Sequence, residues 1–109
     1  MKTIVKAIDN ISQNNFTYLN NNYSWNTQTK TLLLKDKVVD LTSYESAFLD
    51  CLVSRVNENT SYEDIHYSVC YFDEYSQDAI FSIAKRLRKK TKKEFIKSSF
   101  NFGYKIESA

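Results

Sequence analysis

Proline is absent from the 109-residue sequence, and glycine and histidine each occur once, at Gly103 and His66. A single glycine excludes the glycine-rich loops that cradle phosphates in nucleotide-binding enzymes. A single histidine gives little support to histidine-based catalysis, and we expect His66 to be a surface or half-buried residue without a functional role. No enzyme is expected, although a nuclease that uses carboxylates alone stays open.

Cysteine is also scarce, because only Cys51 and Cys70 are present. Their separation fits neither a zinc pattern nor a disulfide framework, so we expect no metal, no cofactor and two small core or semi-buried side chains. No apolar run approaches the roughly eighteen residues that a membrane span requires. The amino terminus is too short and too polar for a signal peptide, so a cytoplasmic protein without membrane contact is expected.

Positive charge is concentrated in one segment of the chain. Residues 85–97 hold eight basic side chains and one acidic one, a net charge of +7, whereas the whole chain has a formal net charge of only +2. The remainder therefore carries −5. A compact cationic element on an acidic body favours binding to a phosphate backbone, because each neutralised phosphate releases counterions. A solvated, lysine-rich helix end explains the same charges and stays open at this point.

The first half of the chain predicts a small sheet. Residues 1–15 have the composition of a linker or an amino-terminal tail, and residues 16–107 form the expected domain. Short alternating segments separated by turns predict antiparallel strands, with asparagine in place of glycine in the turn at 20–22. The predicted strands are Phe16–Leu19, Tyr23–Asn26, Thr31–Leu34 and Val38–Leu41.

The hydrophobic period changes to that of a helix after these strands. Thr42 and Glu45 form a capping box, which predicts a first helix that continues to about Val56. A second capped start at Ser61 predicts a short second helix, and a third helix is expected at about 76–91.

The third helix is amphipathic, with Ile80, Ile83, Ala84 and Leu87 on its predicted buried face. Helical steps of about 100° place Ser82, Lys85, Arg86 and Lys89 on the outward half, with Arg88 at one flank. Residues 95–99 and 102–106 then predict two strands of a hairpin around Phe100 and Asn101. A helix with this outward charge fits the DNA major groove, and the following hairpin can reach phosphates or the adjacent minor groove.

Four stretches in this order match a known family over roughly Phe16 to Glu107. They are Leu41-Thr42-Ser43-Tyr44-Glu45, then Ser61 with Ile65 and Val69, then Arg86-Leu87-Arg88-Lys89-Lys90, and finally Ile96 with Gly103-Tyr104-Lys105-Ile106. On these motifs the chain resembles the effector domain of OmpR/PhoB-type response regulators.

The resemblance implies an α+β fold, a winged helix-turn-helix with an amino-terminal four-stranded antiparallel sheet, three helices and a carboxyl-terminal hairpin wing. It implies sequence-specific binding of double-stranded DNA and transcription regulation, with the third helix in the major groove and the wing, at about 95–106, near the minor groove. Arg86 is expected to read a base, and Lys85, Arg88 and Lys89 to contact phosphates. The full set of expected DNA-binding residues is Ser82, Lys85, Arg86, Arg88, Lys89, Lys97, Ser98, Phe100 and Asn101.

The wing tip departs from the family pattern. Phe100 and Asn101 stand where an arginine and a glycine are usual, which places the insertion of charge into the minor groove in doubt. We expect Phe100 to cover the core of the hairpin, and the alternative is a wedge between base pairs.

The resemblance also suggests partners. Promoter DNA with direct repeats is expected, and a receiver domain and a sensor kinase follow if the chain is a fragment. A stand-alone winged-helix regulator and a non-specific nucleic-acid or protein interaction module remain alternatives. The loop between the second and third helices is the expected contact with RNA polymerase, which names Tyr71, Phe72, Asp73, Glu74 and Tyr75.

Overall fold

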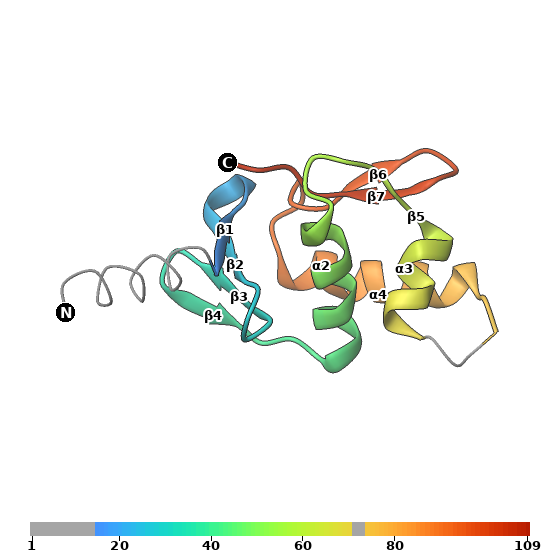
Figure 1. Cartoon of the computed structure of the whole chain (residues 1–109), viewed down its shortest axis with the longest axis horizontal. Helices are drawn as coiled ribbons and strands as arrows, with labels where there is room; N and C mark the ends of the chain where they lie inside the picture. Colours follow the sequence, from blue (N-terminus) through green and yellow to red (C-terminus); the bar gives the residue numbers. More distant parts are fainter. Residues whose placement is uncertain (1–14, 71–73) are drawn as a thin grey trace, which may run out of the picture.

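The computed structural model describes residues 15–70 and 74–109, which contain two antiparallel sheets and three α-helices (Figure 1). The first sheet has the strand order β1-β2-β3-β4, and the second has the order β5-β7-β6. The predicted α+β architecture is therefore confirmed, whereas residues 1–14 of the predicted tail lie outside the described part. The elements are β1 (Phe16–Tyr18), β2 (Tyr23–Asn26), β3 (Thr31–Leu34), β4 (Lys37–Val39), α2 (Ser43–Ser54), β5 (Thr60–Ser61), α3 (Tyr62–Val69), α4 (Gln77–Lys90), β6 (Lys97–Ser99) and β7 (Gly103–Lys105).

Asparagine forms the turns that glycine forms in most proteins. Asn21 and Asn22 have φ angles of 58° and 67° in the short 3₁₀ turn between β1 and β2. Of the six described non-glycine residues with positive φ, four are asparagines, a residue type that tolerates the left-handed region. The predicted turn at 20–22 is confirmed.

The fourth strand lies earlier in the chain than the alternation predicts. Lys35, with a φ of 57°, begins a two-residue turn, so pairing starts at once with Lys37 opposite Leu34. The strand ends at Val39, because the following residues turn toward the cap of α2. The prediction of Val38–Leu41 was therefore wrong by one to two residues.

The first helix begins as predicted and ends early. The Glu45 N–H donates to Thr42 Oγ1 (3.2 Å) and the Thr42 N–H donates to Glu45 Oε1 (3.0 Å), which confirms the capping box. The helix ends at Ser54, two residues before the predicted Val56. Asn57 adopts a φ of 70° and donates its N–H to the Ile106 carbonyl (2.8 Å), which turns the chain away from the helix axis.

The other two helices also begin with a serine cap, of which the one at Ser61 was predicted. The Ser61 hydroxyl accepts the Asp64 N–H (3.1 Å), and the Ser76 hydroxyl accepts the Ala79 N–H (3.2 Å). His66 on α3 is buried, with only 3% of its surface exposed, so the expected surface or half-buried position was wrong. The ring of Tyr75, in the segment that leads into α4, lies 5.4 Å from the His66 ring and helps to cover it.

Apolar side chains from both sheets and all three helices form one core. Cys51 is buried in it and Cys70 is half-buried, as expected. None of the helices in residues 15–70 and 74–109 is long and apolar enough to cross a membrane. The largest fully buried side chains are Trp25, Tyr23, Phe48, Phe95, Leu19, Leu32, Leu49, Leu52, Ile65, Ile80, Leu87 and Ile96.

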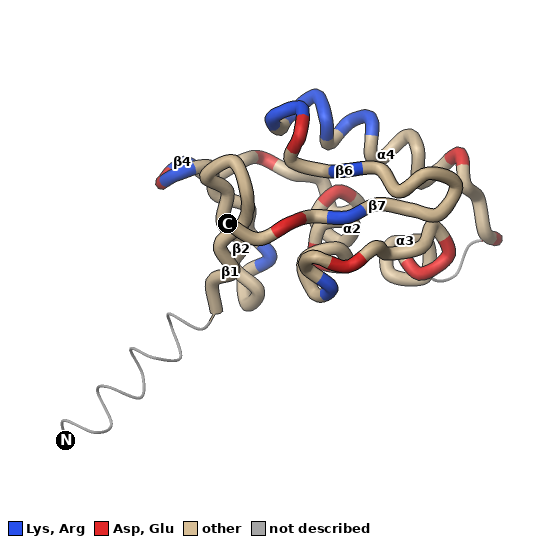
Figure 2. Tube along the Cα trace, turned by 90° about the horizontal axis from the view of Figure 1, so that it is seen from above, with Lys and Arg blue, Asp and Glu red and all other residues tan. Residues whose placement is uncertain are grey.

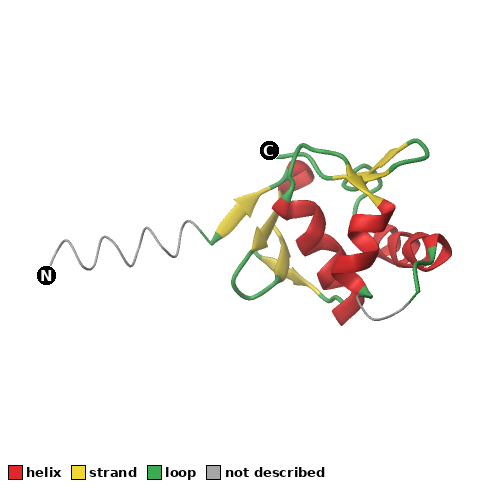
Figure 3. Cartoon of the chain, turned by 45° about the vertical axis from the view of Figure 1, so that its right-hand side comes forward, coloured by secondary structure: helices red, strands yellow, loops and turns green. Residues whose placement is uncertain are grey.

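The amino-terminal sheet holds the chain at the point where it leaves α4. The Tyr23 hydroxyl on β2 accepts the N–H of Lys92 (3.0 Å), and the rings of Tyr23 and Phe95 lie 4.2 Å apart. Leu19 forms a bridge with Ser108 at the other end of the chain. Figure 3 shows this sheet beside the helices. The sheet therefore fixes the connection between α4 and the hairpin β6–β7.

Candidate nucleic-acid interface

Helix α4 separates its apolar and charged residues onto opposite faces. Ile80, Ile83, Ala84 and Leu87 are at most 3% exposed, and they anchor the helix to the core. The remaining half of the helix faces solvent, as the helical spacing predicts. We call this half the outer face of α4, and it consists of Ser82, Lys85, Arg86 and Lys89, all of which are exposed.

The charges of this outer face have no acidic partners within the described part of the chain. No ion pair within 4.0 Å forms at Lys85, Arg86 or Lys89 there. Figure 2 shows basic residues along the later turns of α4 and into the segment that follows it, where one acidic residue, Glu94, comes directly after Lys93. Three unpaired cations on a rigid helix form a surface that attracts a polyanion.

Lys90 is different, because its ammonium group is part of the folded structure. It lies 2.6 Å from Glu45 Oε1 and 3.1 Å from the Asp40 carbonyl oxygen. The Glu45 side chain is 2% exposed. Burial raises the pKa of the Glu45 carboxyl, but hydrogen bonds from Lys90 and Thr42 outweigh burial and hold that pKa below its ordinary value. This pair connects the start of α2 to the end of α4.

Arg88 connects α4 to the hairpin that follows it. Its Nη2 donates to the Ile96 carbonyl (3.0 Å) and to Ser98 Oγ (2.8 Å). The guanidinium carbon also lies 5.2 Å from the centre of the Tyr104 ring, within the range of a cation–π contact. The structure thus brings together Arg88 and Ser98, two of the residues predicted to bind DNA, and fixes the angle between helix and hairpin.

Strand β5 holds the hairpin from its other side, and the sequence analysis missed this strand. Thr60 and Ser61 pair with Tyr104 and Gly103 of β7. A Cβ atom at Gly103 would lie 1.7 Å from the Thr60 carbonyl oxygen, so only glycine fits there. A two-residue strand has no detectable alternation, but the single glycine of the chain was a signal for a close backbone contact.

The tip of the hairpin exposes an aromatic ring. Phe100 is 91% exposed and therefore does not cover the core of the hairpin, so this expectation was wrong. The neighbouring Asn101 has a φ of 55°, in the left-handed region that asparagine tolerates. Lys97, further down the hairpin, donates from Nζ to Glu107 Oε1 (2.5 Å), and this hydrogen bond to the carboxylate raises the pKa of Lys97.

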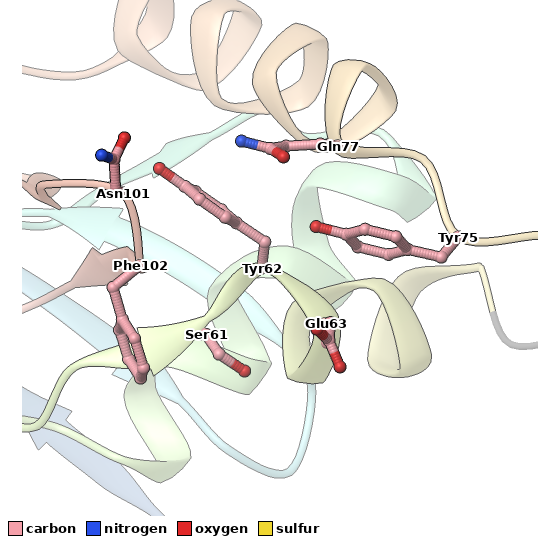
Figure 4. Close-up of a pocket in the computed structure, with 7 residues that line it drawn as sticks. All are labelled: Ser61, Tyr62, Glu63, Tyr75, Gln77, Asn101 and Phe102. Atoms are coloured by element: carbon pink, nitrogen blue, oxygen red, sulfur yellow. The ribbon is translucent and has the colours of Figure 1, made fainter.

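A polar pocket of about 480 Å³ separates the hairpin tip from the amino-terminal ends of α3 and α4. In Figure 4 the Tyr62 hydroxyl points toward Asn101, and the Gln77 amide lies on the same side of the Tyr62 ring. These neutral groups can donate or accept hydrogen bonds. No cluster of three or more residues suited to metal binding occurs within residues 15–70 and 74–109. The pocket is lined by Ser61, Tyr62, Glu63, Tyr75, Gln77, Asn101 and Phe102.

The predicted polymerase contact is described only in part. Tyr71, Phe72 and Asp73 lie outside the described residues, whereas Glu74 and Tyr75 are exposed. Tyr75 covers His66 with its ring while about half of its surface faces solvent. The contact with polymerase stays a prediction.

Solved structures share this fold, although the sequences differ widely. The DNA-binding domain of CpxR from E. coli matches 85% of this chain and 97% of its own, with a TM-score of 0.71 and 20% identity. DrrB, an OmpR/PhoB homologue and response regulator from Thermotoga maritima, matches 84% of this chain with a TM-score of 0.73 and 21% identity. This chain spans 44% of DrrB. No family model matches the sequence, and no curated protein matches it in sequence.

A third neighbour was solved with DNA. The RstA DNA-binding domain of Klebsiella pneumoniae, in complex with the RstA box, matches 84% of this chain and 96% of its own, with a TM-score of 0.70 and 17% identity. These neighbours confirm the predicted winged helix-turn-helix fold, with a four-stranded antiparallel sheet, three helices and a further hairpin.

Proposed function

We propose that this chain binds double-stranded DNA with the outer face of α4 in the major groove and the wing at the adjacent minor groove. The observation that carries the proposal is the unpaired cationic surface of α4, held at a fixed angle to the wing by Arg88. A helix with its side chains is about 10–12 Å wide and fits the major groove of B-DNA. The DNA-bound neighbour of the same fold supports this assignment.

Within the outer face, we assign base reading to Arg86 and phosphate contacts to Lys85 and Lys89. A guanidinium group can form two parallel hydrogen bonds with the O6 and N7 atoms of guanine, whereas an ammonium group acts as a point charge. Ser82 is short enough to let the helix approach base edges. Arg88 uses one nitrogen for the wing, and its other N–H groups remain for a phosphate.

We assign the domain the role of a non-enzymatic output module of a two-component response regulator, acting on promoter DNA in the cytoplasm. The response regulator DrrB supports this role, because this chain matches 44% of its length. The receiver domain, the sensor kinase and RNA polymerase are the further partners that this role implies. Tandem copies on direct repeats would give each α4 one half-site.

Selection of random duplex DNA by the purified chain at two salt concentrations tests the proposal. We expect an enriched motif and an affinity that falls steeply with salt. The double substitution Lys85→Ala and Lys89→Ala should lower the slope of log affinity against log salt by about two, near 0.9 for each phosphate contact. The double substitution Lys30→Ala and Arg55→Ala removes the same charge, but these residues pair with Asp50 and Asp64 and should leave the slope unchanged.

Binding without a motif would reduce the protein to a non-specific nucleic-acid binder. Absence of binding to any duplex, at low salt and with the folded chain, would contradict the proposal. Tighter binding to structured RNA than to duplex DNA at matched salt would contradict it as well.

A further inference from the structure

The tip of the wing carries an exposed apolar side chain in a segment that has no charged residue of its own. Residues 98–104 contain no lysine, arginine, aspartate or glutamate. Phe100 stands at the turn of this segment and is more exposed than any other large hydrophobic residue of the described chain, at 91%. Removing an exposed aromatic ring from water is favourable, so any partner that covers the ring gains binding free energy from this contact.

Hydrogen bonds hold the backbone on both sides of Phe100. The Phe102 N–H donates to the Ser99 carbonyl (2.9 Å), which closes the turn below Phe100. The Phe102 carbonyl accepts the Tyr62 N–H (2.9 Å), and the Ser99 hydroxyl bonds to Asn59. The turn itself and the neighbouring segment 59–62 therefore hold the hairpin, and Phe100 projects from a supported tip.

The position of this tip beside α4 indicates which kind of partner would contact Phe100. Arg88 ties the wing to the helix whose outer face carries the unpaired cations, so a polyanion on that face lies next to the wing. The minor groove of B-DNA is only about 6 Å wide. Two strands about 4.8 Å apart, with their side chains, cannot enter it, but a single side chain at the tip can.

We infer that Phe100 inserts between neighbouring base pairs from the minor groove, unstacks one step and bends the duplex. Without a charge, the ring gains nothing from phosphates and gains most from contact with base faces. Pyrimidine–purine steps such as TA and CA/TG unstack most easily, so the DNA site carries one of them under the wing. This inference rests on the proposed function and adds a specificity element to it.

Short duplexes that contain 2-aminopurine test the insertion directly. The fluorescent base is placed next to a TA step, and the step is moved along the duplex so that it passes under the wing. Affinity and fluorescence are measured for the wild-type chain and for Phe100→Ala, Phe100→Leu and Phe100→Arg. Tyr18→Ala is the matched control, because it removes another exposed aromatic ring (67% exposed), on β1.

The wild-type chain and Phe100→Leu should raise the fluorescence at one position of the step, and Tyr18→Ala should behave as the wild type does. Phe100→Ala should lose this rise and about tenfold in affinity, together with the preference for a flexible step. Phe100→Arg should keep affinity through added charge, show a steeper salt dependence and lose the fluorescence rise.

Two results would overturn the inference alone. One is tight binding of the wild type with unchanged fluorescence at every position, and the other is equal affinity and step preference for Phe100→Ala. Failure of the wild-type chain to bind any duplex would overturn the proposed function as well, so the two failures are distinguishable.

Discussion

The outer face of α4 and the residues Arg88 and Lys90 carry the same charge in different surroundings. Lys85, Arg86 and Lys89 have no acidic partner within 4.0 Å in the described structure, whereas Lys90 contacts a buried carboxylate. Arg88 donates two hydrogen bonds to β6 and its amino-terminal neighbour Ile96. One basic segment thus contains side chains without a partner in the described fold, one side chain, Lys90, that is paired within it, and one, Arg88, that uses a single nitrogen for it.

The difference follows from the position of each residue around the helix. Residues opposite Leu87 point away from the core, and within residues 15–70 and 74–109 no carboxylate lies within 4.0 Å of their cationic groups. Lys90 lies one turn after Arg86, at the end of the helix, where the cap of α2 approaches it. A count of positive charges alone therefore overestimates the charge available to DNA.

The largest effect should come from the partner of Lys90. Glu45→Ala removes the capping box and leaves Lys90 without its carboxylate, so we expect a loss of about 3 kcal/mol in the free energy of unfolding. Urea denaturation followed by circular dichroism measures this change. Glu58→Ala, which removes an exposed glutamate, should change stability by less than about 0.5 kcal/mol. Equal effects of the two variants would contradict the structural role of the pair.

The outer face should show the opposite behaviour. Arg86→Ala should leave the free energy of unfolding within about 0.5 kcal/mol of the wild type, because its side chain is exposed. Its affinity for the selected DNA should fall by about 1–3 kcal/mol, with relaxed preference at one base position. Competition binding against a set of single-base variants measures both quantities. A uniform loss across all sequences would assign Arg86 to a phosphate instead.

The sequence predicted the local elements well, because each has a local signal. The capping serines and Thr42 mark the helix starts, and the apolar spacing of α4 separates its two faces correctly. The turn at 20–22 also followed from the tolerance of asparagine for positive φ.

The contacts of Arg88 with the hairpin and of Lys90 with Glu45 could not be predicted in the same way. Glu45 and Lys90 are 45 positions apart, and only the packed fold brings them within 2.6 Å. Strand β5 has two residues and no period of its own. The exposure of Phe100 depends on the direction of a turn, which a pattern of apolar residues does not specify.

Lys89 and Lys90 form a matched pair that sharpens the comparison. Lys90→Ala should lower the free energy of unfolding by about 1–2 kcal/mol, because the buried Glu45 carboxylate loses a charged donor. Lys89→Ala should leave stability unchanged and reduce the salt dependence of DNA binding by about one phosphate contact. Measuring the free energy of unfolding and the salt dependence of DNA binding on both variants tests whether Lys89 serves the ligand and Lys90 the fold. A loss of stability in Lys89→Ala would contradict this assignment.

The smallest effect concerns pH and again involves Glu45. Burial acts to raise the pKa of this carboxyl, but the hydrogen bonds from Lys90 and Thr42 prevail and hold the pKa below 4.5, the value of an ordinary glutamate. A lowered pKa in the folded state stabilises the fold above that ordinary value, and the contribution disappears as the pH falls through the lowered pKa. Glu45→Gln cannot titrate, so its free energy of unfolding should fall less between neutral and acidic pH than that of the wild type. Parallel slopes in urea denaturation across this range would show that the Lys90 pair does not outweigh the cost of burying the carboxylate.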